Sequence, residues 1–272
     1  MRVAVKGGGT ELSSALRRAS PGDEIILDKG EYRVDGLEVE VDVTLKGGGV
    51  GATKLVFDGY GFICEGVRRF RVEGVSMVSL GEAEVLNVKY GRVEATNCEF
   101  TGCLQASLRV EMGLARIVGC RFHGNGYGAL LCEGSVISVE RCEFSRNEVA
   151  ALWVKGGDLK VERCVFQANM LGIGAAWGSR IKVVDNEFVS HVVDPAVVVM
   201  EKSDAELRGN MFYDCRCGIL LTRYSTATIE GNVFIMCGDG GNPVVSVGGD
   251  CSVRGRVADS NKFVDPRGDI TN

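Results

Sequence analysis

The sequence of 272 residues predicts an all-β solenoid, a parallel β-helix of about ten coils. Three observations predict it. A short unit, in which Asn or Cys stands two residues before Phe, recurs eight times. Five of the seven spacings between successive phenylalanines of these units are 22 residues. Each period holds three short β-type runs and lacks helical periodicity. The phenylalanines are Phe100, Phe122, Phe144, Phe166, Phe188, Phe212, Phe234 and Phe263.

One period shows how three runs fit a single coil. Residues 135–139 and 150–154 are largely apolar runs, and the shorter run 142–144 contains the repeated Phe144. Coils that stack about 4.8 Å apart place equivalent residues above one another. We therefore expect a Phe ladder in the interior, and Asn ladders at the turns with their amides bonded to neighbouring coils.

Composition excludes several classes of partner. Lys and Arg total 31 against 36 Asp and Glu, and no basic stripe is present, so we expect no nucleic acid partner. No run of about 18 apolar residues exists, so we expect no membrane partner. The residues after Met1 lack the apolar core of a secretion signal, which favours a cytoplasmic location.

The eleven cysteines favour reduced, buried thiols. Their number is odd, and no Cys-x-x-Cys pair occurs. Several occupy the ladder position that Asn takes in later coils, where a thiol behaves as a small apolar group. We expect no cofactor and no metal. The ladder cysteines are Cys98, Cys120, Cys142 and Cys164 in one series, and Cys103, Cys215 and Cys237 in another.

The two ends of the chain differ from its middle, and the whole is expected to be one domain. Residues 10–20 have an apolar helical face, formed by Leu12, Ala15, Leu16 and Ala19, and are predicted to cap the first coil. Residues 21–263 are predicted to form the coils. Residues 264–272 are polar and are predicted to be a tail.

Segments at both ends of the repeat region resemble a known family. Residues 21–27 with 30–32, and the later pieces 218–221 and 232–234, resemble right-handed β-helix proteins of the pectin-lyase-like superfamily. They are most similar to the carbohydrate-binding and sugar-hydrolase (CASH) repeats, which also occur in F-box proteins and NosD-type proteins. The resemblance implies a right-handed β-helix. It also implies that catalysis, in members that are enzymes, uses the outer face of residues 129–133 and their equivalents.

This outer face is predicted to be apolar and without catalytic groups. We expect it to bind a protein partner or a second copy, which makes the protein a non-catalytic scaffold. Coverage of the face by the tail after Phe263 is an alternative. A polysaccharide lyase, a glycoside hydrolase or a carbohydrate-binding module remains a further alternative. By alternation, the expected partner-binding residues are Leu130, Leu152, Val154, Val198, Met200 and Leu220.

Two other groups of residues are candidates for chemistry. Four acids near His191 are candidates for calcium binding or acid–base work, although turn acids facing solvent are the favoured interpretation. They are Asp185, Asp194, Asp204 and Asp214. Sugar binding would favour exposed aromatic residues, for which Trp177 and Tyr224 near turns are candidates.

Overall fold

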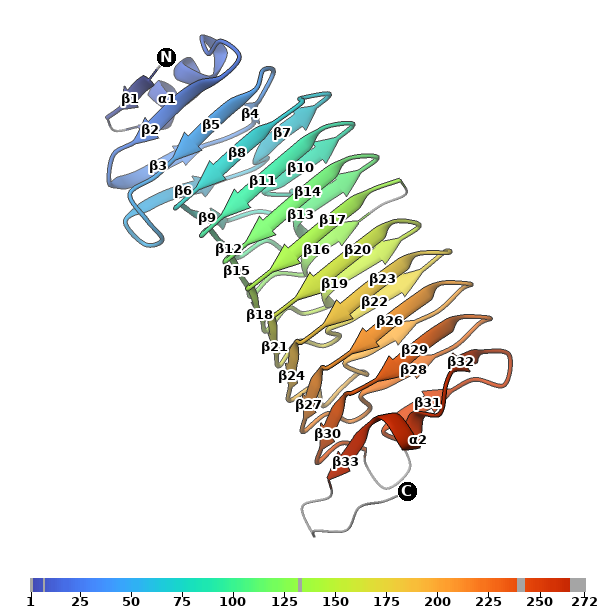
Figure 1. Ribbon diagram of the computed structural model, residues 1–272. Coiled ribbons are helices and arrows are strands. Elements are labelled where there is room, and N and C mark those ends of the chain that lie inside the picture. The colour runs from blue at the N-terminus through green and yellow to red at the C-terminus, as the bar shows by residue number, and fades with distance from the viewer. Residues whose placement is uncertain (1, 7, 132–133, 239–242, 265–272) are drawn as a thin grey trace.

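The protein is an elongated parallel β-helix in the computed structural model, which describes residues 2–6, 8–131, 134–238 and 243–264 (Figure 1). Each coil contributes one strand to each of three sheets, called A, B and C in the order in which the chain passes through them. All pairings between neighbouring coils are parallel, as the 22-residue period predicts. None of the helices in this part of the chain is long and apolar enough to cross a membrane.

Sheet A has twelve strands. They are β1 Arg2–Val5, β2 Asp23–Leu27, β5 Val43–Lys46, β8 Phe70–Glu73, β11 Arg92–Thr96, β14 Leu114–Val118, β17 Val136–Glu140, β20 Asp158–Glu162, β23 Arg180–Val184, β26 Asp204–Arg208, β29 Thr226–Glu230 and β32 Ser252–Arg254.

Sheet B has eleven strands, most of them only three residues long. They are β3 Gly30–Val34, β6 Thr53–Phe57, β9 Ser76–Ser79, β12 Glu99–Thr101, β15 Arg121–His123, β18 Glu143–Ser145, β21 Val165–Gln167, β24 Glu187–Val189, β27 Met211–Tyr213, β30 Val233–Ile235 and β33 Lys262–Val264.

Sheet C has ten strands. They are β4 Leu37–Glu38, β7 Phe62–Glu65, β10 Leu86–Lys89, β13 Ala106–Glu111, β16 Tyr127–Leu131, β19 Ala150–Lys155, β22 Ile173–Ala176, β25 Val197–Val199, β28 Ile219–Leu221 and β31 Val245–Val247.

The repeated phenylalanines form one continuous stack along the interior side of sheet B. From Phe100 to Phe263 the ring centroids of neighbouring coils are 4.5 to 5.1 Å apart, and the rings are within 10° of parallel. All but Phe263 are fully buried. This arrangement confirms the predicted Phe ladder and fixes the rise between coils by direct ring contact.

Asparagine ladders close the turns between sheets A and B. Asn186 Nδ2 donates to Asn210 Oδ1 at 3.0 Å, and Asn210 Nδ2 donates to Asn232 Oδ1 at 2.9 Å. The residue before each ladder position from Cys98 to Asn232 has a left-handed backbone, as at Asp185 with φ of 54°. Each amide also donates a hydrogen bond to a backbone carbonyl of the preceding coil, which satisfies polar groups buried at the turn, as the sequence predicts.

Cysteines replace Asn in the earlier coils of the same ladder. The Cys120 backbone N–H donates to Cys142 Sγ at 3.3 Å, so sulfur accepts the bond that an amide oxygen accepts later. The ten cysteines in the described part of the chain are all free thiols, and eight of them are buried. Cys132 lies outside the described residues.

Short helices lie near both ends of the solenoid. Helix α1, Gly9–Arg17, buries Leu12 and Leu16 against the first coils and so caps the core, in agreement with the expected cap although three residues shorter at its carboxyl end. Helix α2, Val257–Ser260, lies before the last strand. The predicted tail falls almost entirely on residues 265–272, which are outside the described residues.

The expected orientation of β19 is wrong. Leu152 and Val154 are fully buried in the main core, whereas Trp153 and Lys155 lie on the outer face. Ala129 pairs with Leu152, 23 residues later, and Leu152 pairs with Ile173, 21 residues later. Compared with the preceding coil, the turn before β19 therefore has one extra residue and the turn after β19 has one residue fewer. This moves β19 by one residue relative to the 22-residue period, and such a shift exchanges the inner and outer faces of a strand.

We predict that Leu152→Asp unfolds the protein, whereas Leu220→Asp is tolerated. Leu152 has no exposed surface, so the substitution buries an unpaired charge and should cost more than about 4 kcal/mol. Leu220 lies on the outer side of β28 and should cost about 1 kcal/mol or less. Urea unfolding monitored by circular dichroism measures both. Equal stability of the two variants would contradict the orientation of β19.

We also predict that His191→Asn removes part of the acid sensitivity of the fold. A second ladder, of Asn125, Asn147 and Asn169, closes the turns between sheets B and C, and His191 takes the next position in it. Burial lowers the pKa of His191 to about 4. The unfolded chain binds this proton near pH 6.5, so stability present above that pH is lost as the pH falls toward 4. The loss should be about 2 to 3 kcal/mol at pH 4.5.

Urea unfolding of both proteins at pH 7 and pH 4.5 tests this prediction. Asn147 and Asn169 occupy the same ladder, so Asn fits at position 191 without a change of fold. The carboxylates of the chain contribute equally to the pH dependence of stability in both proteins. The same pH dependence in the wild type and the variant would show that His191 titrates normally.

Candidate functional site

The acids named as candidates do not gather into one site. Asp185 and Asp214 occupy left-handed turn positions on opposite sides of sheet B, with φ of 54° and 52°. Asp204 begins β26 on the outer face of sheet A, and His191 is buried in the turn ladder. Asp194 lies in the loop before β25. Within the described residues, no group of three or more His, Cys, Asp or Glu side chains could hold a metal ion.

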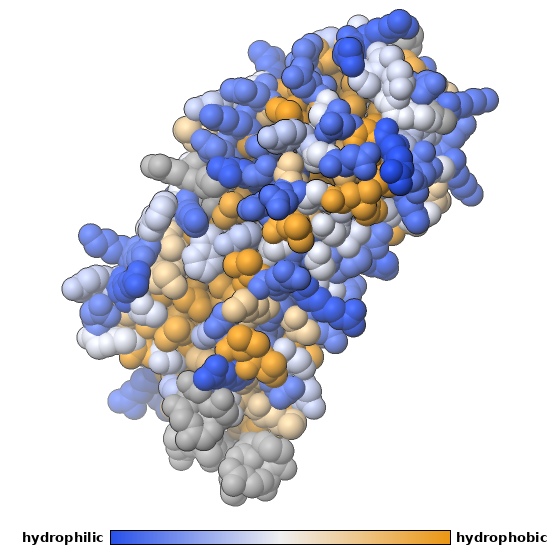
Figure 2. Space-filling view, turned by 180° about the vertical axis from the view of Figure 1, so that it is seen from behind, coloured by the Kyte–Doolittle hydropathy of each residue, from blue (hydrophilic) through white to orange (hydrophobic). Residues whose placement is uncertain are grey.

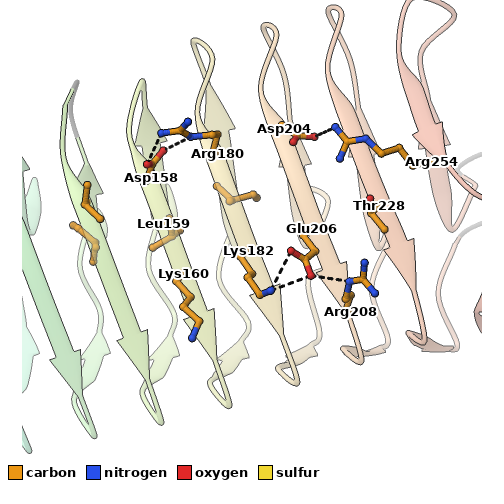
Figure 3. Close-up of a pocket in the computed structure, with 13 residues that line it drawn as sticks. Asp158, Leu159, Lys160, Arg180, Lys182, Asp204, Glu206, Arg208, Thr228 and Arg254 are labelled. Carbon is orange, nitrogen blue, oxygen red and sulfur yellow. Dashed lines mark hydrogen bonds and ion pairs between the residues drawn. The ribbon is translucent and has the colours of Figure 1, made fainter.

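Sheet A instead carries a charged groove on its outer face. The groove has a volume of about 460 Å³ and crosses the strands from β17 to β32, so it follows the axis of the solenoid. Figure 3 shows its charged side chains pointing out from neighbouring strands. Five cations face three carboxylates in it. The charged lining residues are Lys160, Arg180, Lys182, Arg208, Arg254, Asp158, Asp204 and Glu206.

Strand register places these charges in rows. Asp158, Arg180 and Asp204 are directly opposite one another on β20, β23 and β26 and alternate in sign. In the next row Lys160 is directly opposite Lys182. Like charges in facing positions on neighbouring strands are destabilising. Here each lysine also has a carboxylate partner, because Lys160 Nζ lies 2.8 Å from Glu162 and Lys182 Nζ lies 3.0 Å from Glu206.

Ion pairs join the groove carboxylates to cations on other strands. Arg180 binds both oxygens of Asp158 at 2.8 and 2.7 Å, and this contact raises the pKa of Arg180. Lys182 lies 3.0 and 3.1 Å from the two oxygens of Glu206 and, with Arg208, holds the pKa of Glu206 below its usual value. These pairs are exposed, so each contributes little stability and can be exchanged for a ligand.

Comparison with known proteins places the chain in a family. The sequence pattern described as "Right handed beta helix region" matches residues 60–196 and 110–258. The chain belongs to this family. The implied right-handed β-helix is thus confirmed, and no protein of curated function matches the sequence.

Solved structures similar to this β-helix protein include several polysaccharide-processing enzymes. The endo-xylogalacturonan hydrolase from Aspergillus tubingensis has a TM-score of 0.71 at 11% identity, over 98% of this chain and 94% of that one. A mannuronic acid specific polysaccharide family 6 lyase from human gut microbiota has a TM-score of 0.59 at 11% identity, over 97% and 91%. The A-module of an Azotobacter vinelandii mannuronan C-5 epimerase has a TM-score of 0.55 at 14% identity, over 94% of each.

These structures contradict the expected non-catalytic scaffold. The outer face of sheet C was expected to lack charge from residue 129 onward, and its earlier strands carry a polar cluster that this expectation did not consider. Arg109 on β13 lies 3.4 Å from Glu84 and 3.8 Å from Glu111, and Lys89 on β10 lies 3.9 Å from Glu111. Strand register places Asn87 and Arg109 in the same row as Leu130, but Arg109 and Leu130 are 21 residues apart, so the 22-residue period aligns Leu130 with the buried Leu108 instead.

The outer face of the later half of sheet C is apolar, but side chains of the same face bury much of this apolar surface. Leu130, Val198, Met200 and Leu220 do lie on its outer face, as expected. Trp153 occupies the space over Gly174, where a Cβ would collide with the indole ring. Val198 is consequently buried in a small outer cluster with Leu171 and Ala150. Figure 2 shows apolar patches separated by polar side chains on the side turned away in Figure 1.

The structure also reveals a group around His123 that sequence reasoning missed. His123 Nδ1 lies 3.2 Å from Thr101 Oγ1, and its Nε2 lies 3.3 Å from Glu99 Oε1. Partial burial works to raise the pKa of Glu99, but bonds from Ser76 and His123 outweigh it and lower that pKa. The arrangement can orient the imidazole on the outer face of sheet B. The signal was present, because Thr101 and His123 are one 22-residue period apart.

Proposed function

We propose that this β-helix protein is a carbohydrate-active protein that binds an acidic polysaccharide in the groove of sheet A. The observation that carries the proposal is the row in which Lys160 and Lys182 face each other, within a groove of five cations. A linear polyuronate presents one carboxylate per sugar, and the groove presents cations on successive coils. The carboxylates of such a chain would take the place of Glu162 and Glu206 as partners of these two lysines.

The shape of the groove favours a chain over a small molecule. It crosses six neighbouring strands, which spans about 24 Å at the spacing of parallel strands. Each exposed ion pair is weak by itself, so a polyanion that contacts several cations at once can displace them together. The likeness to structures whose titles name xylogalacturonan, mannuronic acid and mannuronan supports an acidic glycan as the substrate class.

The charge pairing favours elimination over hydrolysis as the reaction. Glycoside hydrolysis needs a carboxylic acid that is protonated at working pH. Lys182 and Arg208 both lower the pKa of Glu206, which works against Glu206 acting as that acid. Elimination from a uronate instead needs cations beside the sugar carboxylate, because neutralising it makes the neighbouring C–H more acidic. A base such as water or hydroxide removes that proton, a C=C bond forms, and the glycosidic oxygen leaves and takes a proton from solvent. The groove supplies such cations.

We predict that the double variant Lys160→Gln with Lys182→Gln weakens binding of oligogalacturonate or oligomannuronate by about tenfold, because it removes two charge-assisted contacts. Isothermal titration calorimetry at low and high salt measures the effect, and wild-type binding should weaken as salt screens the charges. The absorbance of an unsaturated uronate product measures elimination in the same samples.

Lys54→Gln is the matched control, since Lys54 is an exposed lysine on β6 of sheet B, outside the groove. It should bind acidic oligosaccharides as the wild type does. An equal loss of affinity in the control, or unchanged affinity in the double variant, would rule out the groove as the binding site. Reducing sugar released without unsaturated product would favour hydrolysis over elimination.

A further inference from the structure

A second cavity lies at the turn between sheets C and A, and aromatic side chains stand at its two ends. It has a volume of about 460 Å³ and is lined by Trp177, Gly178, Glu201, Lys202, Arg223 and Tyr224. These residues come from three successive coils, with Trp177 after β22 and Tyr224 after β28. The intervening coil contributes Glu201 and Lys202. The two aromatic residues are therefore about 10 Å apart along the solenoid axis.

Neither packing nor backbone preference explains these aromatic residues. Trp177 is 65% exposed and Tyr224 is 67% exposed, so neither ring fills the core. Both have left-handed backbones, with φ of 60° and 61°. That conformation costs a bulky residue about 1 kcal/mol and favours Gly or Asn instead. A large apolar ring held exposed at such a position points to a ligand.

Charged groups surround the cavity and leave ring surface facing it. Lys155 Nζ lies 5.6 Å from the centre of the Trp177 ring, in a cation–π contact from the outer face of sheet C. Arg223 Nη1 lies 2.6 Å from Glu201 Oε1 across neighbouring coils. Aromatic faces beside fixed hydrogen-bonding groups match a pyranose ring, which has apolar C–H faces and polar edges. Among the lining residues Lys202 and Arg223 outnumber Glu201, which suits a sugar with a carboxylate.

The cavity also borders the groove of sheet A. Trp177 precedes Arg180 by three residues, and Glu201 precedes Asp204 by three. Arg180 and Asp204 begin their strands at the same edge of the sheet (Figure 3). A sugar held between the aromatic residues would thus lie beside one side of the groove.

We propose that Trp177 and Tyr224 form a subsite that binds one uronic acid ring of a polysaccharide by stacking. The identity of the ligand rests on the proposed function, whereas the location is separate from the lysine pair in the groove. Lys202 and Arg223 face the sugar carboxylate, and the aromatic rings contact its C–H faces. The subsite extends binding around the edge of the solenoid, from sheet A toward sheet C.

Titration of oligogalacturonate, oligomannuronate and a neutral oligosaccharide of equal length tests the subsite. Trp177→Ala and Tyr224→Ala should each weaken binding of an acidic oligosaccharide roughly three- to tenfold, and Trp177→Phe should keep most of the affinity because it keeps a ring. Tyr60→Ala is the control, since Tyr60 is 62% exposed near the amino end of the solenoid. Thermal unfolding should be unchanged in all four variants. Sugar-induced change in tryptophan fluorescence should disappear in Trp177→Ala.

The outcomes separate this inference from the proposed function. If the groove lysine variant loses affinity while both aromatic variants bind as the wild type does, the subsite is wrong and the groove stands. If only the neutral oligosaccharide binds, and does so through Trp177, stacking stands and the acidic substrate is wrong. If no oligosaccharide binds to the wild type, both proposals are overturned. Equal losses in Tyr60→Ala would also overturn the subsite.

Discussion

The structure depends on parallel pairing in register between successive coils. Each strand lies beside its equivalent one coil away, so each side chain is placed over its counterpart. In the interior this gives a stack of parallel phenylalanine rings 4.5 to 5.1 Å apart. At the turns it lets each Asn amide bond to the next. The same register orders the outer faces, where side chains also form rows along the axis.

The rows on the outer faces are less constrained than the ladders inside, and they differ between sheets. Sheet A carries cations and carboxylates that form ion pairs between neighbouring coils. Sheet C changes from a polar cluster around Arg109 to an apolar one around Trp153. A solenoid core tolerates these differences because outward side chains contact only their neighbours in the row. A linear polymer matches this surface, since it too repeats along one axis.

Much of the fold could be predicted, but the candidate site could not. The spacing of the phenylalanines predicts coils and ladders because those positions are buried and identical. The outer face of β19 was assigned wrongly because Ala150, Ala151 and Leu152 are all apolar, so hydrophobicity does not set the phase of alternation there. The Trp153 ring lies over Gly174 and so buries part of the apolar outer face of sheet C, which composition does not predict.

By itself, the sequence determined the solenoid, its helical cap and the Phe, Asn and Cys ladders, because a fixed period repeats the same buried contacts in every coil. The same period aligns Lys160 with Lys182 and Thr101 with His123. Only the tertiary structure decided that His123 also bonds Glu99 and that the lysines pair with Glu162 and Glu206. It also decided that Trp177 and Tyr224 share one cavity. One residue more or less in a turn exchanges the faces of the next strand, and such shifts leave no mark on composition.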